Sequence, residues 1–176
     1  IASFIHMYAD DTKIFRQVDN EMDRDQLQRD LDVLSKWADD WQLHFNIGKC
    51  KVMHMGKGNG KEELRMSGVT LEDTEMEKDL GIWFSADMKF SRHVDQVVSK
   101  ANQILGLIRR TFTYMDGPLM KQLFTSLVRP HLECGNVVWH PYLRKNIEAI
   151  EAVQHRATKM VPGLSKNELG GPMKID

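Results

Sequence analysis

Apolar residues gather in two short runs at the start of the chain and then recur at helical spacing. Two short apolar runs flank a polar tip at residues 9–13, and they consist of Phe4, Ile5, Met7 and Tyr8 before it and of Ile14, Phe15 and Val18 after it. Strand-like runs joined by so tight a turn predict a β-hairpin. From residue 21 to about 43, apolar positions at helical spacing predict one amphipathic helix packed under a sheet. Its apolar stripe is Leu27, Leu31, Leu34, Ala38 and Trp41.

The middle of the chain alternates short β-like runs with turn residues, and the last part is helical. Strands are expected at residues 49–55, 69–71 and 80–84, separated by the glycine-rich stretch 56–60 and by Ser67-Gly68. From Phe90 onward, three apolar stripes at helical spacing predict three helices. Pro118 fits the first turn of the second of these helices, directly after Asp116.

These patterns predict an α+β protein in two parts. Residues 1–88 are expected to combine helix and short antiparallel strands, and residues 89–164 to form a small helical bundle. The Gly-Gly-Pro tail, within residues 165–176, is expected to be loose. We expect the four tryptophans to belong to the core, namely Trp37, Trp41, Trp83 and Trp139.

The composition is that of a folded protein without a membrane span. Of the 176 residues, 41% are hydrophobic, enough for a buried core. No apolar run reaches the roughly 20 residues that a bilayer needs, and no secretory leader is recognisable. The two cysteines, Cys50 and Cys134, make no disulfide framework, so we expect an intracellular protein, cytoplasmic or nuclear and not secreted. Ile1 lies inside a strand pattern, so we expect this chain to be the back part of a longer protein.

Charge is distributed unevenly although the formal net charge is only -1. Residues 19–40 carry eight acidic and three basic side chains, whereas residues 89–166 carry twelve basic and five acidic ones. A basic second half suggests a face for a polyanion such as a nucleic acid. The alternative is that both runs are ordinary solvated helix faces.

The tetrapeptide Tyr8-Ala9-Asp10-Asp11 places two carboxylates at the hairpin tip. Neighbouring like charges are unfavourable unless a cation lies beside them, and Mg²⁺ prefers oxygen ligands. The alternative is ordinary turn chemistry, which aspartate favours, and Asp39-Asp40 is such a pair. The aromatic residue before Asp10-Asp11 and the apolar strands on both sides distinguish this pair from Asp39-Asp40.

Five blocks in order give the chain a resemblance to the reverse transcriptases of non-LTR retrotransposons of the jockey and chicken-repeat type. The blocks are Phe4-Ile5-His6-Met7-Tyr8-Ala9-Asp10-Asp11-Thr12-Lys13; Trp37-Ala38 with Trp41-Gln42-Leu43; Phe45-Asn46 with Lys49-Cys50-Lys51-Val52-Met53; Leu80-Gly81-Ile82; and Val137-Val138-Trp139-His140-Pro141 with Tyr142-Leu143. The resemblance extends to about Leu164, and the sequence departs from it after Ser165.

The resemblance implies a partial polymerase palm in residues 1–88. Asp10 and Asp11 match the metal-binding positions, which implies Mg²⁺ or Mn²⁺ as cofactor and two-metal nucleotidyl transfer. Lys49 matches a lysine that neutralises or protonates the leaving pyrophosphate, although a surface lysine explains it equally well. Tyr8 and Ala9 match positions near the primer end. The turn called the primer grip is matched by Leu80, Gly81, Ile82 and Trp83. Read without the family, that turn is a buried strand with a glycine bulge.

The resemblance implies that the helical part, residues 89–164, is a polymerase thumb that contacts nucleic acid. The implied partners are an RNA template paired with a DNA primer, and deoxynucleoside triphosphates in the full-length enzyme, with no membrane partner. Contacts to phosphates position such a duplex without reading its sequence. The candidates are Arg92, Lys100, Arg109, Arg110 and Lys121.

The resemblance also requires parts that this chain does not supply. A two-metal site needs a further aspartate, which in the family lies upstream together with the nucleotide-binding fingers, so the isolated chain is expected to be inactive. The alternatives are a nucleic-acid-binding remnant without catalysis and an inert retrotransposon relic. A zinc site is disfavoured because His131, Cys134, His140 and His155 lack paired ligand spacing.

Overall fold

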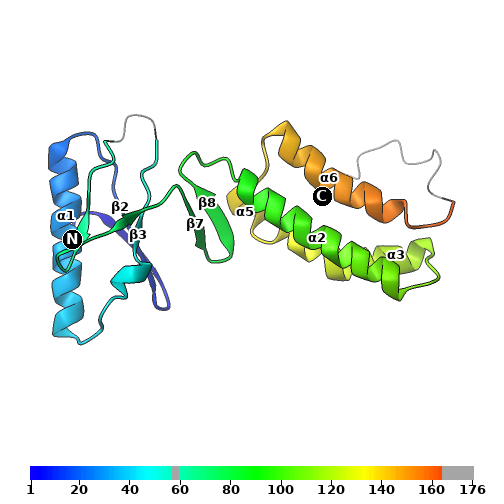
Figure 1. Ribbon diagram of the computed structural model, residues 1–176, viewed down its shortest axis with the longest axis horizontal. Helices are drawn as coiled ribbons and strands as arrows, with labels where there is room; N and C mark the ends of the chain where they lie inside the picture. Colours follow the sequence, from blue (N-terminus) through cyan, green and yellow to red (C-terminus); the bar gives the residue numbers. More distant parts are fainter. Residues whose placement is uncertain (57–59, 164–176) are drawn as a thin grey trace. The chain divides into compact units, whose positions relative to one another are not determined.

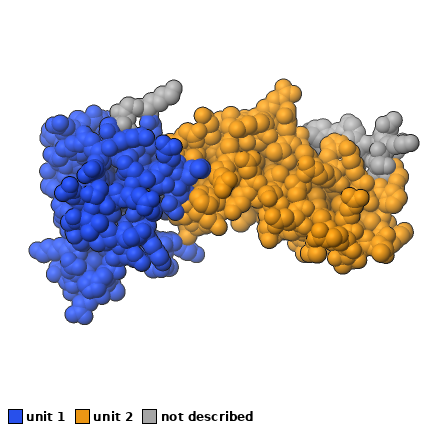
Figure 2. Space-filling model, viewed as in Figure 1, with its two compact units in different colours: residues 1–77 blue, residues 78–176 orange. Residues whose placement is uncertain are grey.

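The computed structural model describes residues 1–56 and 60–163, and the chain divides into two compact units (Figures 1 and 2). The first unit is Ile1–Glu77 and the second is Lys78–Asp176. The division falls inside the strand that precedes Leu80 and Gly81, so this turn belongs to the same unit as the helices. The tail expected to be loose, 165–176, lies outside the described residues.

The first unit begins with an antiparallel hairpin and a long helix (Figure 1). Strands β1 (Phe4–Tyr8) and β2 (Asp11–Phe15) pair in a register that sets Tyr8 opposite Asp11. Helix α1 (Glu21–Asp40) starts where the Asn20 side chain accepts the backbone N–H of Asp23 at 3.1 Å. Acidic side chains in the first turn complement the positive end of the helix dipole. The predicted hairpin and helix are therefore confirmed.

Short elements complete the first unit. They are the 3₁₀ turn η1 (Ile47–Lys49), β3 (Lys51–Val52), β4 (Arg65–Met66), β5 (Val69–Thr70) and β6 (Glu72–Asp73). β4 pairs with β5 in the antiparallel sense, whereas β3 pairs with β6 in parallel. The core consists of Leu31, Leu64, Met66 and Leu71, and Ile14 of β2 packs against it. The hairpin is thus anchored to the core through one strand.

The second unit combines a hairpin with helices (Figure 1). The hairpin is β7 (Met76–Asp79) and β8 (Ile82–Ser85). The helices are α2 (Ser91–Thr111), α3 (Gly117–Leu123), the π-helical turn η2 (Phe124–Val128), α4 (Arg129–Glu133), α5 (Asn136–Trp139) and α6 (Arg144–Thr158). The three expected apolar stripes fall in α2, in α3 with η2, and in or just after α6. Pro118 lies in the first turn of α3 behind Asp116, as predicted.

Two core clusters hold the second unit together. The larger one gathers side chains of α2, α3, η2, α4 and α6 around Ala101, Val128 and Val153, each 0% exposed. The smaller one consists of Phe90, Val94 and Trp139, with Ile82 and Phe84 of β8 packed against it. This smaller cluster attaches the β7–β8 hairpin to the helices.

The tryptophans divide between core and surface. Trp139 is 1% exposed, as expected for a core residue, but Trp37 and Trp41 are 42% and 67% exposed, so the expectation was wrong for them. Trp41 follows the end of α1 and occupies its C-cap position. Trp37 precedes the buried Ala38 by one residue and points about 100° around the helix from it. No helix in the described residues is long and apolar enough to cross a membrane.

Candidate functional site

The hairpin tip carries the two aspartates singled out in the sequence. Tyr8 faces Asp11 across the strands, so Ala9 and Asp10 form a two-residue turn. Ala9 has φ 53°, and a positive φ at the first turn residue suits the right-handed twist of hairpin strands. This positive φ is less favourable for alanine than for glycine, because the Cβ atom of alanine crowds the backbone. Asp10 and Asp11 are both exposed, so their carboxylates are adjacent at an accessible tip.

The two faces of the hairpin have different roles. Because side chains alternate along a strand, Phe4, Tyr8, Asp11 and Phe15 lie on one face, and Ile14 points to the core on the other. Phe4 and Phe15 stack with ring centroids 5.4 Å apart. Both rings remain exposed, which leaves Asp11 at the end of an open aromatic face.

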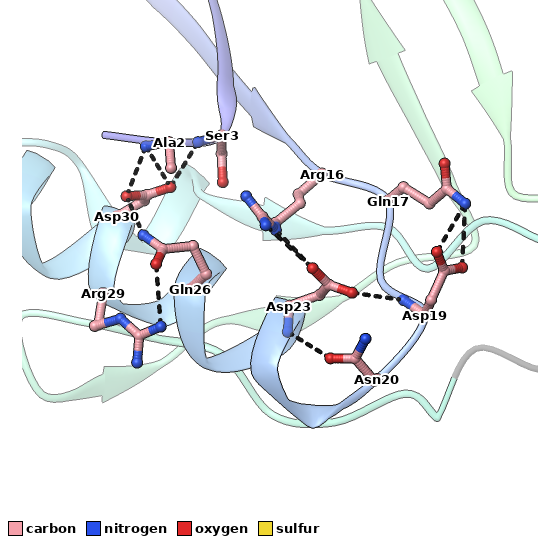
Figure 3. A network of polar contacts seen from close by, with 10 residues as sticks. All are labelled: Ala2, Ser3, Arg16, Gln17, Asp19, Asn20, Asp23, Gln26, Arg29 and Asp30. Atoms are coloured by element: carbon pink, nitrogen blue, oxygen red, sulfur yellow. Dashed lines mark hydrogen bonds and ion pairs between the residues drawn. The ribbon is translucent and has the colours of Figure 1, made fainter.

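The chain entering β1 is tied to the middle of α1 (Figure 3). Asp30 is only 2% exposed and accepts the backbone N–H groups of Ala2 at 3.0 Å and of Ser3 at 2.7 Å. Gln26 donates its side-chain amide to the same carboxylate at 3.0 Å. Burial alone raises the pKa of Asp30, but the hydrogen bonds from Ser3, Ala2 and Gln26 outweigh it and lower the pKa to about 2.

The chain leaving β2 is tied to the start of the same helix (Figure 3). Arg16 forms an ion pair with Asp23 at 3.1 Å, and Asp23 also accepts the backbone N–H of Asp19 at 3.3 Å. The hydrogen bond from the Arg16 side chain is the main reason that the pKa of Asp23 is lowered. Both ends of the hairpin are therefore attached to α1, which fixes the base from which the tip projects.

The tip supplies two carboxylates as candidate metal ligands. Among residues 1–56 and 60–163, no group of three His, Cys, Asp or Glu side chains gathers to hold a metal ion. This applies equally to His131, Cys134, His140 and His155. Lys49 ends the turn η1 and is exposed. In the described part of the chain, no hydrogen bond or ion pair joins Lys49 to either aspartate.

The turn of the second hairpin is also exposed. Leu80 and Gly81 connect β7 to β8 with φ values of 44° and 89°, the pattern of a type I′ turn. Leu80 is 57% exposed, whereas Ile82 packs against the smaller core cluster. The alternative of a buried strand with a glycine bulge was therefore wrong, because Leu80 and Gly81 form the turn itself and the strand begins at Ile82.

Trp83 meets one of the predicted basic residues. The guanidinium carbon of Arg92 lies 5.9 Å from the centroid of the Trp83 ring, within the range of a cation–π contact. Trp83 comes from β8, and Arg92 from the first turn of α2. The structure therefore joins a residue predicted for the primer-grip turn to one predicted for phosphate contacts.

The remaining basic candidates are exposed but do not form one patch. At about 100° per residue, α2 places Arg110 on the same face as Arg92, with Lys100 and Arg109 about 80° and 100° to either side. Arg110 also lines an open groove of about 630 Å³ along α2. Lys121 lies in the last turn of α3.

Two curated polymerases are similar to the chain over most of its length. Over 168 residues it is 22% identical to the RNA-directed DNA polymerase from mobile element jockey of Drosophila melanogaster and 24% identical to that of Drosophila funebris. The alignments cover 90% of this chain but 18% of each relative, so the chain spans less than a fifth of their length. The chain is thus similar, at low identity, to RNA-directed DNA polymerases of the mobile element jockey. No family profile matches the chain, and no solved structure matches it.

Three residues with structural roles near the candidate sites were missed in the sequence. Asp30 anchors the first hairpin, and His93 and Gly135 contact β8 of the second. The sequence did contain a sign that Asp30 is buried. It lies three residues after Leu27 and four before Leu34, so it falls in the apolar stripe. The sequence contained no such sign for His93 and Gly135, because they meet β8 only through contacts between segments that are distant in the sequence.

Proposed function

We propose that the chain is part of an RNA-directed DNA polymerase of a mobile element, with catalysis centred on the tip of the β1–β2 hairpin. The observation that carries this proposal is the adjacent, exposed pair Asp10 and Asp11, at the end of a hairpin tied to α1 at both ends.

The donor set at the tip fits a hard divalent cation. Mg²⁺ takes oxygen ligands and is often held by one or two carboxylates together with substrate phosphates. Asp10 and Asp11 supply such carboxylates, and their exposure leaves room for phosphate oxygens. A bound Mg²⁺ or Mn²⁺ ion supplies activation of the primer hydroxyl and charge neutralisation at the transferred phosphate. The hairpin's own contribution is orientation, because its attachments to α1 keep the carboxylates in one place.

In this account the first unit, with its hairpin, helix and short strands, is the back part of a palm. The second unit supplies the primer-grip-like turn and a helical thumb. Tyr8 and Ala9 lie next to the primer end, and Lys49 assists departure of pyrophosphate in the assembled enzyme. The turn Leu80-Gly81 with Ile82 and Trp83 holds the primer strand, which fits the exposure of Leu80.

The basic side chains of the second unit contact the phosphates of an RNA template paired with a DNA primer. Arg92 and Arg110 share one face of α2, so they are suited to follow one backbone, and Lys100, Arg109 and Lys121 add weaker contacts. Deoxynucleoside triphosphates bind only in the assembled enzyme. The chain by itself does not polymerise, because among the described residues Asp10 and Asp11 have no third ligand.

A second candidate is nucleic-acid binding without catalysis. The observation in its favour is the pairing of Arg92 with Trp83 in a unit whose residues 89–166 carry twelve bases against five acids. Both candidates predict that the isolated chain binds an RNA–DNA hybrid and does not extend a primer.

The experiment that tests the proposal measures both properties on the isolated chain. Fluorescence anisotropy of a labelled hybrid reports binding, and extension of the same primer with all four triphosphates reports activity. We expect salt-sensitive binding and no extension above a heat-inactivated sample. Extension by the isolated chain would show that our account of the ligand set is wrong. Absence of binding by a folded chain would leave the inert relic as the better description.

A further inference from the structure

A buried histidine in α2 contacts the second hairpin through the backbone of β8. His93 lies in the first turn of α2 and is 4% exposed. Its Nδ1 accepts the backbone N–H of Trp83 at 3.4 Å, at the long end of such bonds. Its ring also packs edge to face against Trp139 with centroids 4.9 Å apart. His93 therefore connects β8 to both α2 and α5.

The hydrogen bond defines the form of the imidazole. A nitrogen that accepts a hydrogen bond carries no proton, so the neutral ring has its proton on Nε2. Burial lowers the pKa of His93, and the positive charge of Lys78 on β7 lowers it further, which favours this neutral form. Nε2 is itself buried and has no hydrogen-bond partner within the described residues. The ring is thus held by its Nδ1 bond and by packing.

A glycine completes the support behind the same strand. Gly135 precedes α5 with φ 68°, in the left-handed region. A Cβ atom added there would lie 2.8 Å from Cδ1 of Ile82, so the end of the Ile82 side chain would have to move. Trp139 is fixed in turn by donating its indole N–H to the carbonyl of Cys134 at 2.8 Å. Gly135 and Trp139 therefore lie against Ile82, and His93 bonds the backbone of Trp83.

We propose that His93 is a positioning residue that holds β8, with Gly135 and Trp139, so that the Leu80–Gly81 turn and the Trp83–Arg92 pair present one fixed surface to the duplex. The part of this inference that concerns the duplex rests on the proposed function. An isolated two-stranded hairpin is marginally stable in water, so its orientation depends on what packs behind it. The histidine supplies the only side-chain acceptor found for the Trp83 N–H among the described residues.

The decisive variants differ in whether they keep the acceptor. In His93→Asn, the amide oxygen reaches the place of Nδ1, whereas His93→Leu retains bulk without an acceptor. The intact 176-residue chain, labelled with ¹⁵N, reports hydrogen exchange at the Trp83 amide. The same samples report affinity for a labelled RNA–DNA hybrid. We expect His93→Leu to speed exchange at Trp83 by about fivefold to tenfold and to weaken hybrid binding by about threefold or more. His93→Asn should restore most of both properties.

A second variant tests the same role in case His93→Leu does not fold. Gly135→Ala should push Ile82 and weaken hybrid binding with the rest of the unit folded. Its matched control is Gly163→Ala, which has the same kind of backbone at φ 91° but no atom of the described residues within 4 Å of the added Cβ. The control should bind the hybrid like the unaltered chain.

The two readouts separate this inference from the proposed function. Equal behaviour of His93→Asn and His93→Leu, or unchanged exchange at Trp83 in both, would overturn the positioning role. Loss of protection at Trp83 without any change in hybrid affinity would overturn the link to the duplex. Failure of the unaltered chain to bind the hybrid would overturn the proposed function, and the exchange data would still decide whether His93 holds the strand.

Discussion

The Asp30 carboxylate accepts the backbone N–H of Ser3 at 2.7 Å, which ties the middle of α1 to the residue directly before β1. Asp30 is buried, yet it stays ionised because three groups donate to it. This tie, together with the Arg16–Asp23 ion pair, fixes the hairpin on which Asp10 and Asp11 are displayed.

Replacing Asp30 by alanine should destabilise the first unit. The change leaves the partly buried N–H groups of Ala2 and Ser3 without their acceptor, so we expect a loss of about 1.5–3 kcal/mol in the free energy of unfolding. Urea unfolding followed at amide resonances of β1 and β2 measures it. The matched control is Asp32→Ala, an exposed carboxylate on the same helix, which should cost less than about 0.5 kcal/mol. Equal losses in the two variants would contradict the anchoring role.

Acid should destabilise the first unit over a defined range of pH. The pKa of Asp30 is about 2 in the folded chain, below its ordinary value of 3.8. Because folding lowers this pKa, the stabilisation is complete above about pH 4 and is lost as the pH falls towards 2. It amounts to about 2 kcal/mol. Asp30→Asn should remove this dependence, while the contribution of Asp23 remains in both proteins. If the stabilities of the unaltered chain and Asp30→Asn fell in parallel between pH 4 and 2, the assigned role of the Asp30 carboxylate would be refuted.

Divalent metal binding to the isolated chain should be weak and should depend on Asp10. Two carboxylates without a third ligand predict dissociation constants in the millimolar range for Mg²⁺. Titration with Mg²⁺, or with Mn²⁺ and its paramagnetic broadening, should affect amide resonances at residues 8–11 first. Asp10→Asn should abolish these changes, whereas Asp40→Asn, in an exposed pair at the end of α1, should leave them intact. Binding that survives Asp10→Asn would place the ligands elsewhere.

Binding of an RNA–DNA hybrid should fall steeply with salt. If three to five phosphates are contacted, the logarithm of affinity should fall with the logarithm of salt concentration with a slope of roughly -3 to -4. Replacing Arg109 and Arg110 together by alanine should flatten the slope by up to about two units. The control with the same change in charge is the double replacement of Arg144 and Lys145 on α6. A slope that changes equally in both double variants would show that only net charge matters.

The sequence was informative where structure depends on near neighbours. The hairpin around Asp10 follows from the short apolar runs on each side of a short turn, and the start of α3 follows from Asp116 and Pro118. The Leu80–Gly81 turn was less evident, since a glycine within an apolar run also fits a bulge. Similarity to the jockey polymerases supports the retroelement reading, whereas the palm and thumb assignments remain predictions.

Contacts between distant segments could not be read from local patterns. His93 and Gly135 meet β8 only after α2 and α5 have packed, and no spacing in the sequence encodes that encounter. Trp41 was expected in the core because its position fits the helical period, but the helix ends one residue before it. The basic candidates were read as a cluster, and only the helix geometry shows that Arg92 and Arg110 share a face.

The most direct test of the central claim is primer extension by a chimaeric polymerase. The segment of the Drosophila melanogaster jockey polymerase that aligns with this chain is replaced by this chain, and the initial rate is measured on an RNA template. We predict that the chimaera extends the primer and that Asp10→Asn lowers the rate by at least about 100-fold, while Asp40→Asn leaves it nearly unchanged. A chimaera that stays inactive beside an active parent, or equal rates for Asp10→Asn and Asp40→Asn, would contradict the account.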